Sequence, residues 1–251
     1  MSEQYDPKTF FKFLGYAPAA DEYSCPGLRT INVYCRGDRA QLEQMVSLTP
    51  LKLESDIFIV TVADFSNVTN SPYMDAGVVL AVSYGDQKAG NYFFEFEDQH
   101  WSCAAGRELW GYPKRYTKIS LDKNDEGAQG KVRDYDTSII EIGVEFDDSV
   151  TNDAWSEAKF APTIQVRGVP QLRGDSFDSL DVIMRDTAHN FKVTERRLGK
   201  GSVELGPVDT GSGLLGGEPL KILEVLGAEY VVGDFASTTE YGAPVTLASL
   251  A

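Results

Sequence analysis

Histidine and cysteine are scarce in this sequence of 251 residues. Only two histidines, His100 and His189, and three cysteines, Cys25, Cys35 and Cys103, are present. Their spacing matches no metal-ligand motif, and three irregularly placed cysteines do not make a disulfide framework. The sequence therefore predicts neither a metal centre nor a disulfide-stabilised fold, and nothing in it supports a histidine-dependent catalytic triad.

Positive charge and long apolar runs are also lacking. The chain has 23 basic against 38 acidic residues, a net charge of −15, and no block of five or more basic residues. This balance argues against nucleic acid and against an anionic membrane surface as partners. No apolar run is long enough for a membrane-spanning helix, and the N-terminal residues lack the basic start and apolar core of a signal peptide. We therefore expect no membrane association and a cytoplasmic protein.

Short apolar runs bounded by turn residues dominate what is present. Such runs predict strands, and no Pro-, Gly- or Ser-rich linker divides the chain. Chains of this length commonly form one domain. We predict a single domain over residues 1–251, of the α+β class, mainly antiparallel β and barrel-like with a few short helices. The strands are expected at 30–35, 56–62, 78–84, 92–96, 116–121, 131–133, 138–146, 163–169, 180–185, 190–195, 201–205 and 229–234.

Three segments have helical patterns. Residues 39–46 carry apolar side chains at helical spacing after Asp38, a favourable N-cap residue. Residues 102–110 form a second candidate, which Gly111 would end. Residues 220–226 follow a proline, which is common in the first turn of a helix. We expect a short helix at each of these places.

One glycine-rich string invites a nucleotide-binding interpretation. Residues 211–216 read Gly-Ser-Gly-Leu-Leu-Gly and match the G-x-G-x-x-G fingerprint of dinucleotide-binding proteins. That fingerprint acts where a strand turns into a helix inside a βαβ unit, and no such alternation surrounds it here. We interpret the segment as a loop, and no cofactor is predicted for this chain.

The most informative stretch is residues 107–115, Arg-Glu-Leu-Trp-Gly-Tyr-Pro-Lys-Arg. Lys114 directly follows Tyr-Pro, precedes a second cation, Arg115, and comes after an apolar run. Desolvation by apolar neighbours and a nearby like charge both lower the pKa of an amine. A neutral lysine can add to a ketone and form a Schiff base. Lys114 is therefore a candidate covalent catalyst, although a lysine-arginine pair after a proline is otherwise usually a solvated turn.

This stretch resembles the signature of the acetoacetate decarboxylase family, Arg-Glu-x-x-x-Tyr/Phe-Pro-Lys-Lys, with Arg115 in place of the second lysine. Acetoacetate decarboxylase is an established example of a lysine activated beside another cation. The resemblance implies that Lys114 forms the Schiff base and that Arg115 contributes positive charge near its amine. Weaker similarities at residues 73–77, 161–170 and 218–241 extend the resemblance over nearly the whole chain.

The resemblance also implies roles for other charged residues. Arg29 would bind the substrate carboxylate by two parallel hydrogen bonds. Asp75, at the position of a family glutamate, would relay a proton or orient the carbinolamine. Glu108 would hold Arg107 or Arg115 in place. Arg29 and Asp75 could equally be ordinary surface charges.

Aromatic residues and two departures from the family pattern bear on the substrate. Trp101, Trp110 and Tyr112 would line a dry pocket, although tryptophans near a motif are more often core residues. Asp75 is one methylene shorter than the family's glutamate, and Val60 stands where the family has a second acid. These departures favour a substrate other than acetoacetate, but they do not affect the lysine that forms the Schiff base.

Together these patterns predict a Schiff-base-forming carbon–carbon lyase whose partner is a small-molecule keto acid. The intact signature makes decarboxylation of an acetoacetate-like β-keto acid, through an iminium on Lys114, the first expectation. A Schiff-base aldolase or dehydratase acting on pyruvate or another keto acid is the second, and a non-catalytic small-molecule binder of the same fold is the third. Because family members assemble as homo-oligomers, the resemblance implies a homo-oligomer here.

Overall fold

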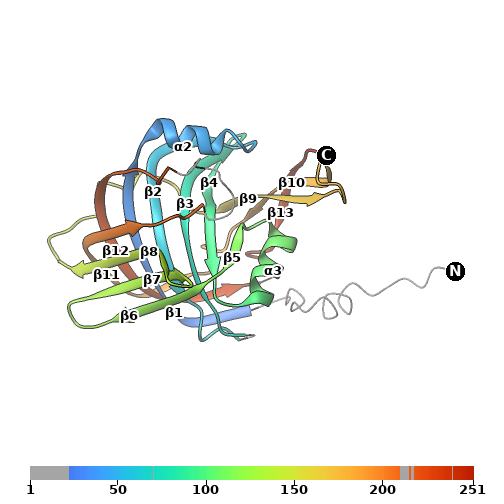
Figure 1. The fold of residues 1–251 in the computed structure, drawn as a ribbon. Coiled ribbons are helices and arrows are strands. Elements are labelled where there is room, and N and C mark those ends of the chain that lie inside the picture. The colour runs from blue at the N-terminus through green and yellow to red at the C-terminus, as the bar shows by residue number, and fades with distance from the viewer. Residues whose placement is uncertain (1–22, 70, 210–214, 216–217, 239) are drawn as a thin grey trace.

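The computed structural model describes residues 23–69, 71–209, 215, 218–238 and 240–251. The described strands form one 13-stranded sheet (Figure 1). In chain order they are β1 (Tyr23–Gly37), β2 (Lys52–Asp64), β3 (Met74–Tyr84), β4 (Gln87–Glu97), β5 (Lys114–Tyr116), β6 (Lys118–Lys123), β7 (Gly127–Asp134), β8 (Thr137–Phe146), β9 (Thr163–Pro170), β10 (Phe177–Arg185), β11 (Lys192–Leu205), β12 (Ile222–Ser237) and β13 (Val245–Ser249). The helices described are α2 (Arg39–Val46) and α3 (His100–Trp110).

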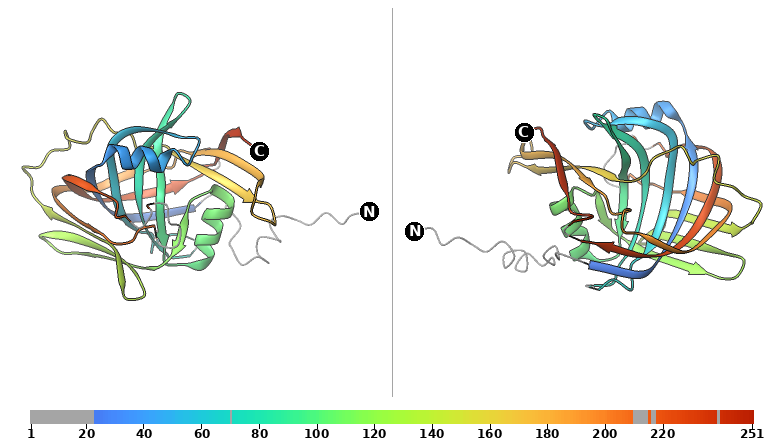
Figure 2. Two further views of the ribbon diagram at one scale, coloured as in Figure 1. Left: turned by 45° about the horizontal axis from the view of Figure 1, so that its top comes forward. Right: turned by 180° about the vertical axis from the view of Figure 1, so that it is seen from behind.

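The sheet is strongly coiled but does not close. Its strand order is β13-β10-β9-β4-β3-β2-β1-β12-β11-β8-β7-β6, with β5 beside β4. Neighbouring strands are antiparallel, except that β4 pairs in parallel with β5 and, at one bridge, with β9. Figure 2 shows the strands curving around a shared interior, and β6 packs against β2 and β3 across it. The predicted α+β, mainly antiparallel and barrel-like fold is confirmed, with an open sheet in place of a closed barrel.

One face of the sheet forms the main hydrophobic core. Side chains alternate between the two faces of a strand, so every second residue of the central strands points inward. Burying a large aliphatic or aromatic side chain stabilises a fold by about 1.5–3 kcal/mol. Val60, where the resemblance places a family acid, is fully buried in this core. The core includes Ile31, Val33, Phe58, Val60, Val62, Val78, Leu80, Phe94 and Phe96.

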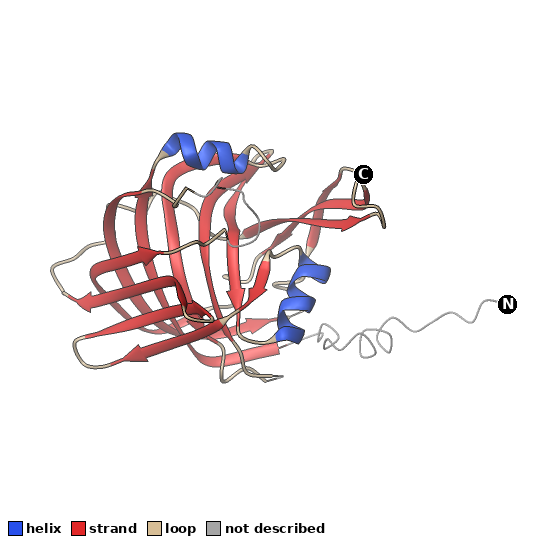
Figure 3. Ribbon diagram, in the orientation of Figure 1, coloured by secondary structure: helices blue, strands red, loops and turns tan. Residues whose placement is uncertain are grey.

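The opposite face of the same strands carries polar and aromatic side chains. Thr61, Asp75 and Glu95 alternate with core residues and line a cavity on this side. The helix α3 packs against β4, β5 and β9 and covers part of this face (Figure 3). The two faces of one sheet therefore separate the core from the space where a ligand can enter.

Both described helices confirm the predictions made for their segments. Asp38 caps α2 because its carboxylate accepts hydrogen bonds from two backbone N–H groups of the first turn. Gly111 ends α3 with a φ of 74°, in the left-handed region that glycine adopts readily. The N–H of Gly111 donates to the Arg107 carbonyl at 3.1 Å. Within the described ranges, neither helix is long and apolar enough to cross a membrane.

The helix predicted at residues 220–226 is wrong. This segment leads into β12, a strand of 16 residues that begins at Ile222 opposite Gly37 of β1. A short apolar run does not by itself distinguish a helix from a strand, and pairing with β1 decides in favour of the strand. Of the glycine-rich string 211–216, only Leu215 lies within the described residues.

Candidate active site

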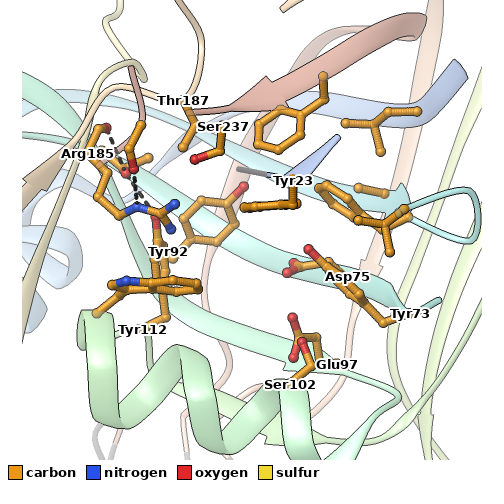
Figure 4. A pocket seen from close by; sticks show the side chains of 18 of the residues that line it. Tyr23, Tyr73, Asp75, Tyr92, Glu97, Ser102, Tyr112, Arg185, Thr187 and Ser237 are labelled. Atoms are coloured by element: carbon orange, nitrogen blue, oxygen red, sulfur yellow. Dashed lines mark hydrogen bonds between the residues drawn. The ribbon is translucent and has the colours of Figure 1, made fainter. Parts of the chain in front are cut away.

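A cavity of about 560 Å³ opens on the polar face of the sheet (Figure 4). Its volume falls within the range of about 300–1,000 Å³ that is typical of small-molecule sites. The structure places Trp101, Trp110 and Tyr112 in its wall, so the aromatic residues singled out from the sequence surround a common space. The aromatic lining comprises Tyr23, Phe65, Tyr73, Tyr92, Trp101, Trp110, Tyr112, Phe191 and Phe235.

Lys114 enters the cavity wall at the first residue of β5. The left-handed turn at Gly111 and the following Tyr112-Pro113 carry the chain from the end of α3 to this strand. The lysine side chain is only 8% exposed, and it passes directly beside Gly106 of α3. A Cβ atom at Gly106 would lie 2.5 Å from Lys114 Cδ. The absence of a side chain at residue 106 therefore makes room for the lysine.

Three carboxyl groups surround the Lys114 amine. The Nζ atom donates a hydrogen bond to Asp75 Oδ2 at 2.8 Å, lies 3.1 Å from Glu95 Oε1, and contacts Glu97 Oε1 in a short hydrogen bond. Strand register explains this convergence, because Asp75 pairs with Glu97 and Glu95 pairs with Lys114. All four side chains are buried. The lysine thus lies in an acidic cage on the cavity wall.

The acidic cage reverses the expected shift in the lysine pKa. Burial alone disfavours the ammonium, but the charges of Asp75, Glu95 and Glu97 outweigh it and raise the pKa of Lys114 well above its usual value. Burial also raises the pKa of Glu95 well above the usual glutamate value and raises that of Glu97, although Lys114 lowers both. The amine is therefore held as an ammonium beside carboxyl groups that bind protons more readily than glutamates in water.

Two oxygen atoms of the cage have no hydrogen-bond partner in the described part of the protein. Among the described residues, Glu95 Oε2 and Glu97 Oε2 are buried and make no hydrogen bond. Leaving a buried polar group unpaired costs about 1–3 kcal/mol, so these atoms are suited to exchange protons with a bound molecule. No group of three His, Cys, Asp or Glu side chains in the described part of the chain could hold a metal ion. The cage is thus arranged for proton transfer around an amine.

Of the charged residues suggested by the resemblance, Asp75 lies in the cage and the others do not line the cavity. Arg29 forms an ion pair with Asp64, with its Nε atom 3.0 Å from Asp64 Oδ2. Glu108 is exposed on α3. Arg115 follows Lys114 in β5, and strand alternation turns consecutive side chains to opposite faces. Arg115 is accordingly not among the residues that line the cavity.

The sequence interpretation missed Glu95 and Glu97. The sequence predicts a strand at residues 92–96, and the segment Phe94-Glu95-Phe96-Glu97 alternates apolar and acidic residues. Such alternation is normally typical of a strand with one solvated face. The alternation is present, but α3 and the aromatic lining cover the acidic side. The sequence did contain one indication. The two glutamates are two residues apart, and this spacing places both side chains on the same face of a strand.

A buried arginine was also missed. Arg185 is the last residue of β10, is 6% exposed and lines the cavity. Its Nε atom donates to the Gly242 carbonyl at 2.9 Å, and its guanidinium carbon lies 4.1 Å from the centre of the Trp110 ring. An arginine that ends a predicted strand gives no sign in the sequence that it is buried. Its position depends on tertiary packing between β10 and α3.

The comparisons with known proteins agree with this architecture. The acetoacetate decarboxylase of Burkholderia ambifaria (strain MC40-6) is 27% identical over 164 residues, which cover 64% of this chain and 64% of that protein. The crystal structure of acetoacetate decarboxylase from Legionella pneumophila has a TM-score of 0.75 at 18% identity and covers 99% of both chains. The enduracididine biosynthesis enzyme MppR, complexed with pyruvate, has a TM-score of 0.68 at 13% identity and covers 90% of both. The two structural likenesses show a shared fold.

A family model extends the comparison along the chain. The model for acetoacetate decarboxylase matches residues 15–245. This range includes the stretch 107–115, the whole acidic cage and Arg185. Because the match covers most of the sequence, this chain belongs to the acetoacetate decarboxylase family.

Proposed function

We propose that this protein is a Schiff-base-forming carbon–carbon lyase that acts on a keto acid through an iminium on Lys114. The observation that carries the proposal is the acidic cage, in which a buried lysine amine contacts Asp75, Glu95 and Glu97 beside a cavity. Membership of the acetoacetate decarboxylase family supports the same chemistry. Decarboxylation of a β-keto acid is the reaction that we favour.

The first chemical step removes a proton from the amine. Lys114 rests as an ammonium, and an ammonium has no electron pair with which to attack a ketone. Glu97 contacts the amine directly, and its raised pKa allows it to hold the proton. In a buried site, a neutral amine beside a neutral acid is less unfavourable than in water, because both charged partners lose hydration there. The cage thus supplies the base that the amine needs.

The next steps form the iminium. The neutral Nζ atom attacks the carbonyl carbon, and the oxygen takes a proton to give a carbinolamine. A carboxylic acid of the cage then protonates the hydroxyl group, water leaves, and the nitrogen electron pair forms the C=N bond. The iminium carries one positive charge, as the ammonium did. The carboxylates of Asp75, Glu95 and Glu97 therefore stabilise the intermediate with the same arrangement that stabilises the resting lysine.

The carbon–carbon bond breaks once the iminium is present. In a β-keto acid, the electron pair of the bond to the carboxylate moves toward the iminium, carbon dioxide leaves, and a neutral enamine remains. The enamine carbon takes a proton from an acid of the cage, and water hydrolyses the resulting iminium to release the ketone. Asp75, Glu95 and Glu97 line the cavity around this reaction and can carry these protons.

An aldolase or dehydratase is the second candidate function. The same enamine can attack an aldehyde or lose a β-hydroxyl group without any release of carbon dioxide. The likeness to MppR, which has been solved with the condensation product of pyruvate and imidazole 4-carboxaldehyde, favours this alternative. A cavity of about 560 Å³ also leaves room for a second reactant beside a short keto acid.

Borohydride trapping tests the proposal directly. The protein is incubated with acetoacetate or with pyruvate, reduced, and weighed intact beside a Lys114→Ala variant. We expect a mass increase equal to the reduced imine, with the modified peptide containing Lys114, and no increase in the variant. Release of carbon dioxide from acetoacetate distinguishes the decarboxylase from the aldolase. No adduct with either acid would overturn the lyase and favour a non-catalytic binder.

A further inference from the structure

Arg185 is a buried cation with no anionic partner among the residues that the structure describes. Among the described residues, no carboxylate lies within ion-pair distance of its guanidinium, whereas Arg29, Arg36, Arg167 and Arg196 each have one. Burying a charge is costly unless it is paired. Because Arg185 lines the cavity, the missing partner can be supplied by a ligand.

The guanidinium of Arg185 is held in a fixed orientation. The Gly242 carbonyl accepts from Nε on one edge, and the Trp110 ring stacks at 4.1 Å. Thr163 links the same region, since its hydroxyl lies 3.0 Å from the Tyr112 hydroxyl and 3.3 Å from the Arg185 carbonyl. Restrained side chains lose little entropy when they bind a ligand. The terminal nitrogen atoms lie on the cavity side, where the Tyr23 and Tyr112 side chains interact with the guanidinium (Figure 4).

Two phenols accompany the guanidinium. Tyr23 and Tyr112 both interact with Arg185 and both line the cavity. A guanidinium donates two parallel hydrogen bonds to a carboxylate, and phenolic hydroxyl groups can donate to its remaining lone pairs. This combination of donors matches a planar anion such as a carboxylate.

Arg185 lies away from the acidic cage. In Figure 4 it is on one side of the cavity, while Asp75 and Glu97 are on the other. The Tyr112 ring lies close to both regions, because Lys114 Nζ is 5.5 Å from its centre and its hydroxyl group is linked through Thr163 to Arg185. A substrate that is bound to Lys114 through its ketone and also contacts Arg185 would therefore lie along the Tyr112 side chain.

We propose that Arg185 binds a carboxylate of the substrate that is remote from the reacting ketone, so that the preferred substrate is a keto acid with an apolar, ring-sized spacer between the two groups. This proposal rests on imine formation at Lys114. The aromatic lining between the two sites suits such a spacer. The cavity volume of about 560 Å³ is also larger than a short keto acid requires.

A remote anchor also fits the chemistry of decarboxylation. A cation that holds the departing carboxylate stabilises the ground state and opposes the loss of carbon dioxide. A cation that holds a second carboxylate contributes binding energy without this penalty, and that energy can position the ketone at the amine. Arg185 therefore acts on substrate choice, while Lys114 and the acidic cage perform the reaction.

Two pairs of probes test the proposal with the full-length protein. The first pair is 4-(3-oxobutyl)benzoate and its neutral amide, which carry the same ketone across a phenyl ring and are compared by borohydride trapping on Lys114. The second pair is 4-propylbenzoate and its amide, which have no ketone and are compared by calorimetry. We expect the wild type to prefer each carboxylate over its amide at least about tenfold, and Arg185→Gln to bring both ratios close to one.

The outcomes separate this proposal from the proposed function. If the wild type binds each carboxylate and its amide equally well in both assays, the proposed role of Arg185 is wrong. It is also wrong if Arg185→Gln still prefers the carboxylates over the amides. If no ketone is trapped but 4-propylbenzoate binds through Arg185, the lyase fails and the carboxylate site stands. If Arg185→Gln does not fold, the wild-type ratios of carboxylate to amide binding decide the question. Arg185→Lys then serves as the second variant. It keeps the positive charge but not the planar guanidinium, so we expect it to weaken the preference for the carboxylate.

Discussion

The two faces of the central strands differ completely, although they are built from alternating residues of the same segments. On one face, Val60, Val62 and Val78 belong to an apolar core. On the other, Asp75, Glu95 and their neighbours enclose the Lys114 amine beside a cavity. A shift of one residue along a strand therefore moves a side chain from the core to the site.

This difference indicates which face stabilises the fold and which performs the chemistry. The apolar face gains free energy by burial, whereas the cavity face bears the cost of buried charges and of two unpaired carboxyl oxygens. A site of this kind is unfavourable by itself and depends on a rigid support. The core face supplies that support, because it is formed by the same strands.

The largest effect is expected from Lys114→Met. The imine is lost completely, and three carboxyl groups remain buried without a cation. The pKa of Glu95 and Glu97 then rises further, because Lys114 no longer lowers it. A folded-state pKa above the unfolded value stabilises at low pH and loses that contribution as the pH rises through it. The variant should therefore unfold at a clearly lower temperature at about pH 8 than at about pH 5, more so than the wild type.

The exposed Lys88 provides the control for that measurement. It pairs with Glu54 at 2.8 Å on the surface, with 63% of its side chain exposed. Lys88→Met should leave both trapping and the pH dependence of thermal unfolding unchanged. If Lys114→Met and Lys88→Met had the same unfolding temperature at every pH, the predicted coupling between Lys114 and the carboxyl groups of the cage would be wrong.

The next largest effect is a loss of stability. Two substitutions compare the two faces of the sheet, because each introduces an aspartate on one of them. Val60→Asp buries a carboxylate in the apolar core and should destabilise the fold by about 4 kcal/mol or more. Ala63→Asp, on the cavity face, should cost clearly less, because Ala63 lines the cavity and is only partly buried. Chemical denaturation of both variants measures the difference. Equal destabilisation would show that the cavity face is as closed as the core.

Part of this division could be predicted from the sequence and part could not. The stretch 107–115 identified Lys114, and local patterns gave α2, α3 and most strands. Glu95 and Glu97 were visible as an alternating pair, but only tertiary packing shows that their side of the strand is covered. The same holds for Arg185, which is a long-range contact of β10 with α3. The resemblance placed an acid at Val60, whereas the structure supplies the additional carboxylates from β4.

Two glycine substitutions sharpen the comparison with a smaller effect. In Gly106→Ala, the new methyl group would lie 2.5 Å from Lys114 Cδ and displace the amine. Misplacement of a reacting group by about 1 Å costs on the order of 100-fold in rate, so trapping should fall by this factor. Stability should not fall much, because alanine is favoured over glycine in a helix by about 0.5–1 kcal/mol.

Gly130→Ala is the matched substitution on the core face. Its methyl group would lie 2.8 Å from Val62 Cβ, within the apolar core. Overpacking should destabilise the fold by about 1–3 kcal/mol, while the folded fraction traps substrate at the wild-type rate. Trapping kinetics and denaturation of the two variants thus form a crossed experiment. If Gly106→Ala lost stability but still trapped substrate at the wild-type rate, residue 106 would have no role in positioning the lysine.

The smallest effect is expected from Arg29→Gln. Arg29 belongs to β1, whose neighbouring residues Leu28 and Thr30 line the cavity, but Arg29 itself does not line it. Arg29 forms an ion pair with the buried Asp64. Burial raises the pKa of Asp64, but the hydrogen bonds from Ser66 and Arg29 lower it by more, so the net pKa is lowered. A lowered carboxyl pKa contributes stability at neutral pH that is lost in acid. The variant should lose about 1 kcal/mol or less, mainly at neutral pH, because the arginine is partly exposed.

Acetoacetate trapping in Arg29→Gln should stay within about twofold of the wild type, since the ion pair with Asp64 already occupies the guanidinium. The resemblance assigns the substrate carboxylate to Arg29. In the described part of the chain, however, Arg185 is a cation of the cavity wall with no carboxylate within ion-pair distance. The two assignments therefore predict opposite results when the two variants trap 4-(3-oxobutyl)benzoate and its amide. If Arg29→Gln abolishes the preference for the carboxylate over the amide and Arg185→Gln does not, the ion pair of Arg29 must open when substrate binds. The carboxylate site then belongs to β1 instead of β10.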